Sequence, residues 1–206
     1  MKQINLGDTN QRVSAVALSI MRMVRLDTDQ AANILNTVHD QGVNFIDGAD
    51  IYGNGQSEST FGAAFKKSGL KRDDFFIQSK GGIVLDPQKS SGELVFGQRY
   101  DFSKQHLIEA VDGILQRMQI DYLDSFLLHR PDALMEPEEV AAAFDELQAA
   151  GKVRHFGVSN FNPMQVDLVQ SALSQKLMIN QLQFGVMHTG PIQFGLHPNM
   201  HDAASV

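Results

Sequence analysis

The sequence of 206 residues contains no cysteine and no tryptophan, and it has no long hydrophobic run. The absence of cysteine excludes a disulfide framework, a zinc site built on thiolates and a thiol nucleophile. It is typical of proteins in a reducing compartment, so we expect a cytoplasmic protein. No segment approaches the roughly 18 apolar residues that a membrane helix needs, so we expect no membrane partner. The polar N-terminus, from Met1 to Asn5, lacks the apolar core of a signal peptide.

Basic clusters are also missing from the sequence. There are 17 lysines and arginines against 24 aspartates and glutamates, which gives a formal net charge of −7. A nucleic-acid partner would require a basic patch, so we expect none. The chain is 43% hydrophobic and 20% charged, as is usual for a soluble globular protein. We expect a single domain over residues 1–206.

Short apolar runs alternate with amphipathic helical patterns along most of the chain. The predicted strands cover residues 15–19, 44–47, 75–80, 124–129, 153–159 and 178–182. Helices are predicted between them, the first over 28–40 and the others beginning at Ser57, Ser103, Pro137 and Pro163. Asp27 and Gln30 have the spacing of a capping box at the start of the first helix. Residues 81–102, which are rich in Gly, Ser and Asp, are predicted to be irregular.

Strands that alternate with helices imply a parallel sheet, and two architectures of that kind compete. An open, doubly wound sheet that binds a dinucleotide has a glycine-rich turn after its first strand. Residues 19–23, which occupy that place, contain no glycine. A barrel instead carries polar functional residues at the carboxyl ends of several strands, as this sequence does. We therefore predict an α/β fold, a parallel (β/α)8 TIM barrel.

The sequence supplies fewer units than a complete barrel requires. Six strand–helix units can be counted, the sixth without its helix, whereas a barrel has eight units and typically about 250 residues. After about residue 183 no strand or amphipathic helix is evident. We expect the C-terminal units to be missing and the chain to be a truncated form of a longer protein.

Four polar residues lie at or just after the ends of three successive predicted strands: Asp47, Tyr52, Lys80 and His129. Tyrosine alone is a poor acid, with a reference pKa of about 10. An ammonium such as that of Lys80 would favour the phenolate and lower this pKa, and Asp47 could hold the ammonium in place. His129 could orient a substrate oxygen or relay a proton. Such a set suits protonation of a carbonyl oxygen while a hydride arrives at its carbon.

At these residues the sequence resembles the aldo-keto reductases. The resemblance extends to about residue 183, and its anchors are residues 47–53, 79–80, 127–132, 151–161 and 180–181. Residues 51–53 and 129–132 are most similar to a bacterial subgroup of uncharacterised oxidoreductases. The resemblance implies reduction of an aldehyde or ketone to an alcohol by direct hydride transfer from NADPH, without a metal. Asp132 near His129 has no third ligand at useful spacing, so we expect no metal site.

The resemblance also implies roles for individual residues. The family's catalytic tetrad falls on Asp47, Tyr52, Lys80 and His129, and Tyr52 is its general acid. The positions that hydrogen-bond the nicotinamide carboxamide fall on Ser159, Asn160 and Gln181. Met21 lies where the first strand meets the active-site face, and it is a further candidate contact for the cofactor. Gly48 stands where many members carry threonine.

An alternative function follows from parts of the family pattern that have no counterpart here. These are an aromatic residue that stacks under the nicotinamide and a basic segment that binds the adenosine 2′-phosphate. Some family members act as NADPH-sensing partners of other proteins, so the alternative is a catalytically silent NADPH-binding or regulatory protein, or an inactive fragment. The intact tetrad favours the enzyme. The sequence predicts neither which carbonyl compound is the substrate nor the oligomeric state.

Overall fold

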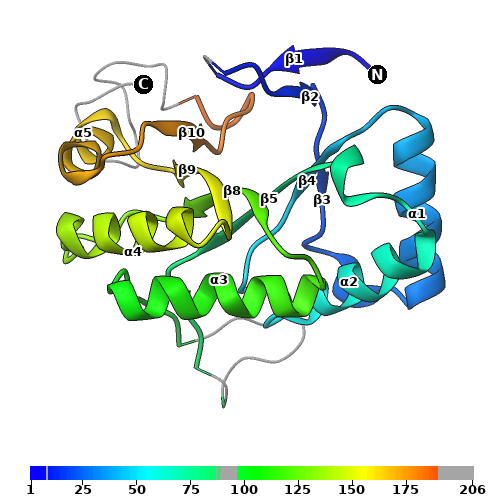
Figure 1. Cartoon of the computed structure of the whole chain (residues 1–206), viewed down its shortest axis with the longest axis horizontal. Coiled ribbons are helices and arrows are strands. Elements are labelled where there is room, and N and C mark those ends of the chain that lie inside the picture. Colours follow the sequence, from blue (N-terminus) through cyan, green and yellow to red (C-terminus); the bar gives the residue numbers. More distant parts are fainter. Residues whose placement is uncertain (8, 87, 89–96, 190–206) are drawn as a thin grey trace.

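The fold is that of a computed structural model, which describes residues 1–7, 9–86, 88 and 97–189. Its centre is a parallel sheet of six strands. These strands are β3 (Leu18–Ser19), β4 (Phe45–Asp47), β5 (Phe76–Gly81), β8 (Leu123–Leu128), β9 (Val153–Ser159) and β10 (Leu177–Gln181). Figure 1 shows the helices around the outside of the sheet: α1 (Thr28–Asp40), α2 (Gln56–Ser68), α3 (Lys104–Met118), α4 (Pro137–Ala149) and α5 (Pro163–Ala172).

The order of the strands favours a barrel over a doubly wound sheet. Across the sheet the order is β10-β9-β8-β5-β4-β3, so the strands follow one another as they do along the chain. A doubly wound sheet would reverse direction at a switch point. The sheet is also strongly curved, because Gln181 Nε2 of β10 lies 3.3 Å from Asp47 Oδ2 of β4. In a flat sheet these two strands would be roughly 19 Å apart.

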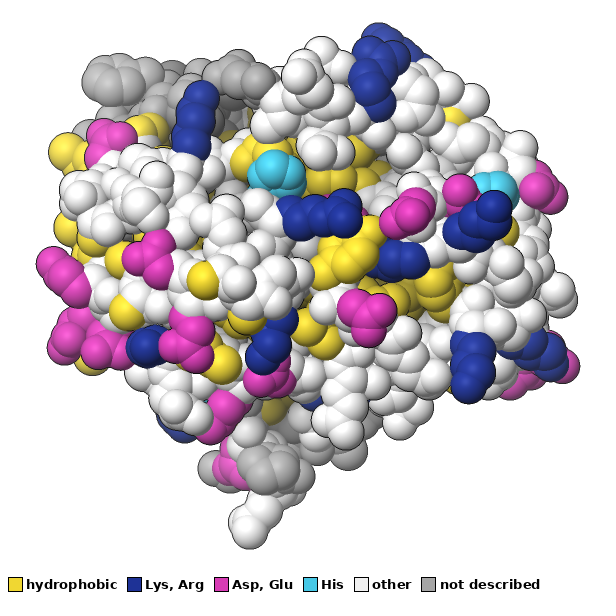
Figure 2. Space-filling view, in the orientation of Figure 1, with side chains coloured by type: hydrophobic (Ala, Val, Ile, Leu, Met, Phe, Trp, Pro, Cys, Tyr) yellow, Lys and Arg dark blue, Asp and Glu magenta, His cyan; other side chains and the backbone are white. Residues whose placement is uncertain are grey.

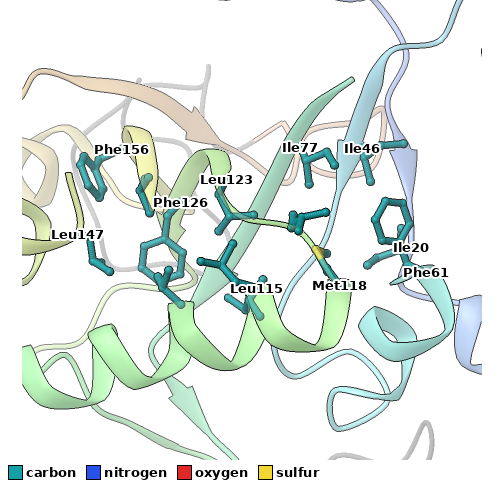
Figure 3. Close-up of a cluster of buried hydrophobic side chains, with 14 of the residues drawn as sticks. Ile20, Ile46, Phe61, Ile77, Leu115, Met118, Leu123, Phe126, Leu147 and Phe156 are labelled. Carbon is teal, nitrogen blue, oxygen red and sulfur yellow. The ribbon is translucent and has the colours of Figure 1, made fainter. Parts of the chain in front are cut away.

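The main hydrophobic core fills the space between the sheet and the helices. Every residue of β5 and β8 is buried, as expected for parallel strands covered on both faces. Figure 3 shows residues from α3 packing against residues from the strands, among them Leu115, Met118, Phe126 and Ile77. Farther along the sheet, Phe144 of α4 stacks on Phe156 of β9 with ring centroids 4.0 Å apart. Burial of each such side chain contributes about 1.5–3 kcal/mol.

The helix ends agree with most of the sequence signals. Asp27 and Gln30 form the predicted capping box, with Gln30 N donating to Asp27 Oδ1 at 2.8 Å. Ser103 caps α3 by accepting a hydrogen bond from His106 N at 3.3 Å. Pro137 and Pro163 each lie at the start of a helix, where the missing N–H costs nothing.

The prediction that Ser57 caps a helix is wrong. The helix α2 already begins at Gln56, and Gly55, with φ of 83°, precedes it. The Ser57 side chain is buried and joins α2 to the segment after β3. Its hydroxyl donates to Met21 O at 3.1 Å and accepts from Val24 N at 3.3 Å. The hydroxyl therefore bonds to residues far away in the sequence instead of to the first turn of α2, which the sequence near Ser57 does not indicate.

The first predicted strand is also shorter than expected. Of residues 15–19, only Leu18–Ser19 pair in the sheet. The chain before them forms an antiparallel hairpin, β1 (Gln3–Asn5) with β2 (Arg12–Ser14), that the sequence analysis did not predict. Within residues 81–102, β6 (Ile83–Val84) pairs with β7 (Arg99–Tyr100), so this part is more ordered than predicted. Residues 85–86 and 97–98 are irregular, as predicted, whereas residues 87 and 89–96 of this segment and residues 190–206 of the predicted tail lie outside the described residues.

The face of the molecule seen in Figure 2 mixes basic and acidic side chains, and acidic ones gather over α4. This helix carries Glu138 and Glu139 in its first turn.

None of the helices in the described part of the chain is long and apolar enough to cross a membrane.

Gly62 allows α2 and α3 to approach closely, so we expect Gly62→Ala to destabilise the protein. An added Cβ would lie 2.5 Å from Arg117 O, a backbone atom that cannot move away cheaply. Helix propensity alone would favour alanine by about 1 kcal/mol, but we expect the clash to prevail with a net cost of about 1–3 kcal/mol in urea unfolding. Gly113→Ala is the matched control, because its Cβ would meet only the flexible end of Arg117, at 2.7 Å. Equal stabilities of the two variants would contradict this account.

Candidate active site

Asp47 and Lys80 form a buried ion pair at the carboxyl end of the sheet. Asp47 is the last residue of β4, and Lys80 is the last but one of β5. Lys80 Nζ donates to Asp47 Oδ1 at 2.7 Å and to Gly48 O at 2.7 Å. Only 3% of the Lys80 side chain and 10% of the Asp47 side chain are exposed. The ammonium is thus held in the place that the sequence pattern predicts for it.

Tyr52 and His129 lie beside this ion pair. The two rings meet edge to face, with centroids 6.0 Å apart and an interplanar angle of 81°. Lys80 Nζ is 5.4 Å from the centroid of the Tyr52 ring. Tyr52 lies in the loop after β4, and His129 directly follows β8. The fold therefore brings together four side chains from three neighbouring strand ends.

The pKa of Tyr52 is raised to about 12, first by burial and then by the carboxylate of Asp47. This is the opposite of the direction expected from the sequence. Lys80 is close to the ring, but its ammonium is hydrogen-bonded to Asp47, so the carboxylate offsets its charge. Tyr52 consequently keeps its proton throughout the neutral range, and a donor with a pKa this high gives up that proton reluctantly.

His129 is neutral at physiological pH. Its pKa is lowered to about 3, first by burial and then by the positive charges of Lys80 and Arg130. Its Nδ1 atom is buried and has no hydrogen-bond partner. A neutral imidazole carries one N–H donor and one acceptor, so it can orient a substrate oxygen but has no spare proton to release.

Burial also lowers the pKa of Lys80, and the Asp47 carboxylate opposes that effect. A polar network on the inner face of the barrel, which the sequence analysis missed, surrounds the pair. Gln78 Nε2 donates to Asp47 Oδ1 at 2.7 Å, and Ser125 Oγ donates to Gln78 Oε1 at 3.1 Å. Gln78 is two residues from Lys80, so the period-two alternation of a strand puts both on one face. This alternation could have identified Gln78 from the sequence.

The residues that the sequence analysis assigned to the nicotinamide lie together at the ends of β9 and β10. Asn160 N and Ser159 Oγ both donate to Gln181 O, at 3.0 Å and 3.1 Å. Asn160 adopts a left-handed backbone conformation, with φ of 61°. The Gln181 side chain reaches Asp47, which links this group to the ion pair. Met21 follows β3 at the other edge of the sheet, and 46% of it is exposed.

Metal binding finds no support in the described part of the chain, where no group of three His, Asp or Glu side chains could hold an ion. The polar set can hold and orient a small molecule, supply hydrogen bonds to a developing oxyanion, and provide a phenolic proton at its edge. These capabilities follow from the chemistry of Asp47, Tyr52, Lys80 and His129 in one buried cluster.

A second ionisable cluster lies behind the loop that carries Tyr52. Burial raises the pKa of the Asp50 carboxyl well above its usual value, and the Glu58 carboxylate raises it further. Glu58 itself is buried and accepts from Arg117 Nε at 2.7 Å. The Asp50 Oδ1 atom is buried and has no hydrogen-bond partner. The fold therefore favours the neutral form of the Asp50 carboxyl.

We expect Asp50→Asn to stabilise the protein increasingly as the pH rises. A carboxyl whose pKa is raised on folding favours the folded state below its unfolded pKa, and that contribution is lost as the pH rises through the folded pKa. Between pH 4 and pH 8 the gain should grow by about 1.4 kcal/mol for each unit by which folding raises the pKa of Asp50. Urea unfolding at pH 4 and pH 8 tests this, with the exposed Asp121→Asn as the equal-charge control. A gain that is the same at both pH values would rule out the titration of Asp50.

Comparison with known proteins places this chain among related sequences and folds. The model of the Aldo/keto reductase family matches residues 19–194. The chain is 36% identical over 190 residues to oxidoreductase YdhF of Escherichia coli, covering 91% of this chain and 62% of that protein. It is 39% identical over 149 residues to a 6-dehydroglucose reductase of Agrobacterium fabrum, covering 72% and 50%.

The fold is similar to that of aldo-keto reductase AKR11C1 from Bacillus halodurans in its holo form. The TM-score is 0.78 at 29% identity, over 93% of this chain and 60% of that one. The predicted barrel class is therefore confirmed. The chain spans about half to three fifths of the length of the curated relatives it matches.

Proposed function

The chain belongs to the aldo/keto reductase family, and we propose on that basis that its protein reduces an aldehyde or ketone to an alcohol with NADPH. The observation that carries the proposal is the buried Asp47–Lys80 pair, at 2.7 Å, beside the rings of Tyr52 and His129. A protein that only held its shape would gain little from burying this ion pair, because desolvation offsets most of the attraction.

The residues at the ends of β9 and β10 fit a nicotinamide. A carboxamide needs both donors and acceptors, and Ser159, Asn160 and Gln181 offer hydroxyl and amide groups within one hydrogen-bonded group. Met21 is a further contact that we propose for the cofactor. The nicotinamide supplies the hydride when it is bound. The preference for NADPH over NADH is inferred from the family.

The proton is assigned to Tyr52. Its pKa of about 12 keeps the phenol protonated until the carbonyl oxygen gains negative charge. Neutral His129 donates a hydrogen bond to the same oxygen and orients it. Lys80 supplies positive charge next to the ring, and Asp47 fixes its position. These groups together stabilise the developing oxyanion at a largely buried cluster.

The partner of this site is a small carbonyl compound. A relative of the chain is named as a 6-dehydroglucose reductase, so an oxidised sugar is the first substrate to test. Simple aldehydes and ketones form the rest of the panel. The absence of cysteine fits a reducing cytoplasm, which is where NADPH-dependent reduction would take place.

Cofactor titration followed by turnover tests the proposal. NADPH fluorescence is recorded on the purified protein, and the carbonyl panel is then assayed by loss of NADPH absorbance. Saturable binding with turnover is the expected result. Binding without any turnover would favour the silent, regulatory alternative, and the absence of binding would favour an inactive fragment.

A further inference from the structure

Gln78 lies in a row of polar side chains on the inner face of the barrel. In the register of the sheet, Gln78 of β5 pairs with Asp47 of β4 on one side and with Ser125 of β8 on the other. Residues paired in this way point to the same face of a sheet. Gln78 is only 2% exposed, and its side chain also reaches Gln181 of β10. Gln78 therefore connects its own strand with three others.

Gln78, Asp47 and Gln181 form a closed ring of hydrogen bonds. Gln78 Nε2 donates to Asp47 Oδ1 at 2.7 Å and to Gln181 Oε1 at 3.3 Å. Gln181 Nε2 completes the ring by donating to Asp47 Oδ2 at 3.3 Å. The strands β4 and β10 are not neighbours in the sheet, so the ring crosses the interior of the barrel. It links the Asp47–Lys80 ion pair with the end of β10, where a residue assigned to the nicotinamide lies.

The ion pair determines how both amides of the ring are oriented. Asp47 faces the ammonium of Lys80 as a carboxylate, and a carboxylate can only accept hydrogen bonds. Gln78 and Gln181 must therefore turn their nitrogen atoms toward Asp47. The oxygen of Gln78 then faces Ser125, whose hydroxyl donates to it at 3.1 Å. Hydrogen-bonding chemistry thus fixes which end of each amide points where.

The ring uses both N–H groups of Gln78 but only part of the Gln181 amide. Gln181 donates one N–H and accepts one hydrogen bond, and its side chain has no further partner among the described residues. A side-chain amide can donate two hydrogen bonds and accept two. Gln181 therefore keeps one N–H and one lone pair for a ligand, and the ring sets the direction in which it offers them.

We propose that Gln78 is a positioning residue, which orients the Gln181 amide toward a nicotinamide carboxamide and holds Asp47 against Lys80 at the same time. This inference rests on the proposed function, because Gln181 can act on a cofactor only if the protein binds one. Gln78 acts through its neighbours, since both of its N–H groups are already donated inside the barrel.

A residue that only filled space would differ from a positioning residue in one measurable way. Loss of a space-filling side chain would change NADPH binding by the same factor whether or not Gln181 is intact. Loss of a positioning residue weakens NADPH binding only through Gln181, so its effect disappears once Gln181 has lost its amide. A double-mutant cycle between Gln78 and Gln181 separates the two roles.

The cycle consists of Gln78→Met, Gln181→Met and the double variant, each titrated with NADPH by fluorescence. Methionine has a similar length but no amide, so it removes the hydrogen bonds with little change in volume. We expect Gln78→Met to weaken NADPH binding about two- to tenfold, the equivalent of one ordinary hydrogen bond. The double variant should bind NADPH no more weakly than Gln181→Met alone.

Nuclear magnetic resonance of the cofactor-free protein tests the ring itself. The side-chain amide signals of Gln78 and Gln181 are assigned by their disappearance in the two single methionine variants. In Gln78→Met the Gln181 signals should shift and should exchange faster with water, because Gln181 loses the hydrogen bond to its oxygen. The signals of Gln183, which is exposed and outside the ring, should stay where they are.

Ser125→Ala provides a second variant, which keeps the test decisive if Gln78→Met does not fold. It removes the hydroxyl that holds the oxygen of Gln78, so it should shift the Gln181 signals and weaken NADPH binding, both to a smaller extent. Ser79→Ala is the matched control. Ser79 is equally buried, but it points away from the ring, because its hydroxyl donates to Glu58 Oε1 at 3.2 Å.

Three outcomes overturn the positioning role: Gln181 signals that do not respond to Gln78→Met or Ser125→Ala, additive losses of NADPH affinity in the cycle, or a Ser125→Ala variant that behaves like Ser79→Ala. Failure of the proposed function is a different result. In that case the unchanged protein does not bind NADPH, whereas the positioning role fails alone if the unchanged protein binds NADPH and the Gln181 signals ignore Gln78.

Discussion

Replacement of Tyr52 by Phe is expected to reduce carbonyl reduction by about 10²–10⁴-fold, the range typical of losing a general acid. The variant removes one oxygen and keeps the ring, which packs edge to face on His129. Binding of NADPH should stay within about twofold, because the residues assigned to the nicotinamide lie at the ends of β9 and β10, away from Tyr52. The measurement compares kcat with the Kd for NADPH in the same preparation.

Tyr100→Phe is the matched control for this experiment, since Tyr100 is 37% exposed on β7 and has no assigned role. It should turn over like the unchanged protein. Full turnover by the Tyr52→Phe variant would mean that the proton comes from another group, and the assignment of Tyr52 would be abandoned. A loss of NADPH binding in that variant would instead place Tyr52 in the cofactor site.

Replacement of Lys80 by Met is expected to destabilise the fold by about 3–5 kcal/mol, the usual effect of leaving one partner of a buried ion pair alone. Asp47 would keep the hydrogen bond from Gln78 Nε2 at 2.7 Å, but its carboxylate would lose its ammonium in a buried site. Urea unfolding followed by circular dichroism gives the free energy of unfolding. Lys152→Met is the control, because its ion pair with Asp112 lies at the surface, with 35% and 48% of the two side chains exposed, and should contribute at most about 1 kcal/mol.

The double variant Asp47→Asn with Lys80→Met separates an unpaired charge from a packing defect. It removes both charges and should recover much of the stability lost in the single variant. This holds even if the single variant does not fold. If the double variant is as unstable as Lys80→Met alone, the lysine stabilises the fold through its packing. If Lys80→Met lowers the free energy of unfolding by less than about 1 kcal/mol, water screens the ion pair.

Much of the framework could be predicted from the sequence because its signals are local. The capping box at Asp27 and the prolines that begin α4 and α5 lie within a few residues of the features they specify. The choice of a barrel needed only the missing glycines after the first strand and the polar residues at several strand ends. Asp47 and Lys80 could be named because each lies at the end of a predicted strand, which fixes its place at the edge of the sheet.

What failed at the sequence level depended on residues far away in the chain. Ser57 has the chemistry of a helix cap, yet its hydroxyl bonds to Met21 and Val24, more than thirty residues earlier. The strands β1 and β2 are too short to show a clear alternation of apolar and polar residues. Gln78 was passed over because a glutamine within a strand has meaning only once the inner face of the barrel is known.

The sequence by itself determined the order of the elements, the parallel sheet and the identity of the four polar residues, since these follow from periodicity and from positions at strand ends. Only the tertiary structure decided how these groups ionise. The pKa of Tyr52 rises because burial and Asp47 outweigh a lysine whose charge is already paired. The raised pKa of Asp50 also depends on the tertiary structure. The groups around this carboxyl come from α2, α3 and β5, and desolvation depends on everything that packs around a group.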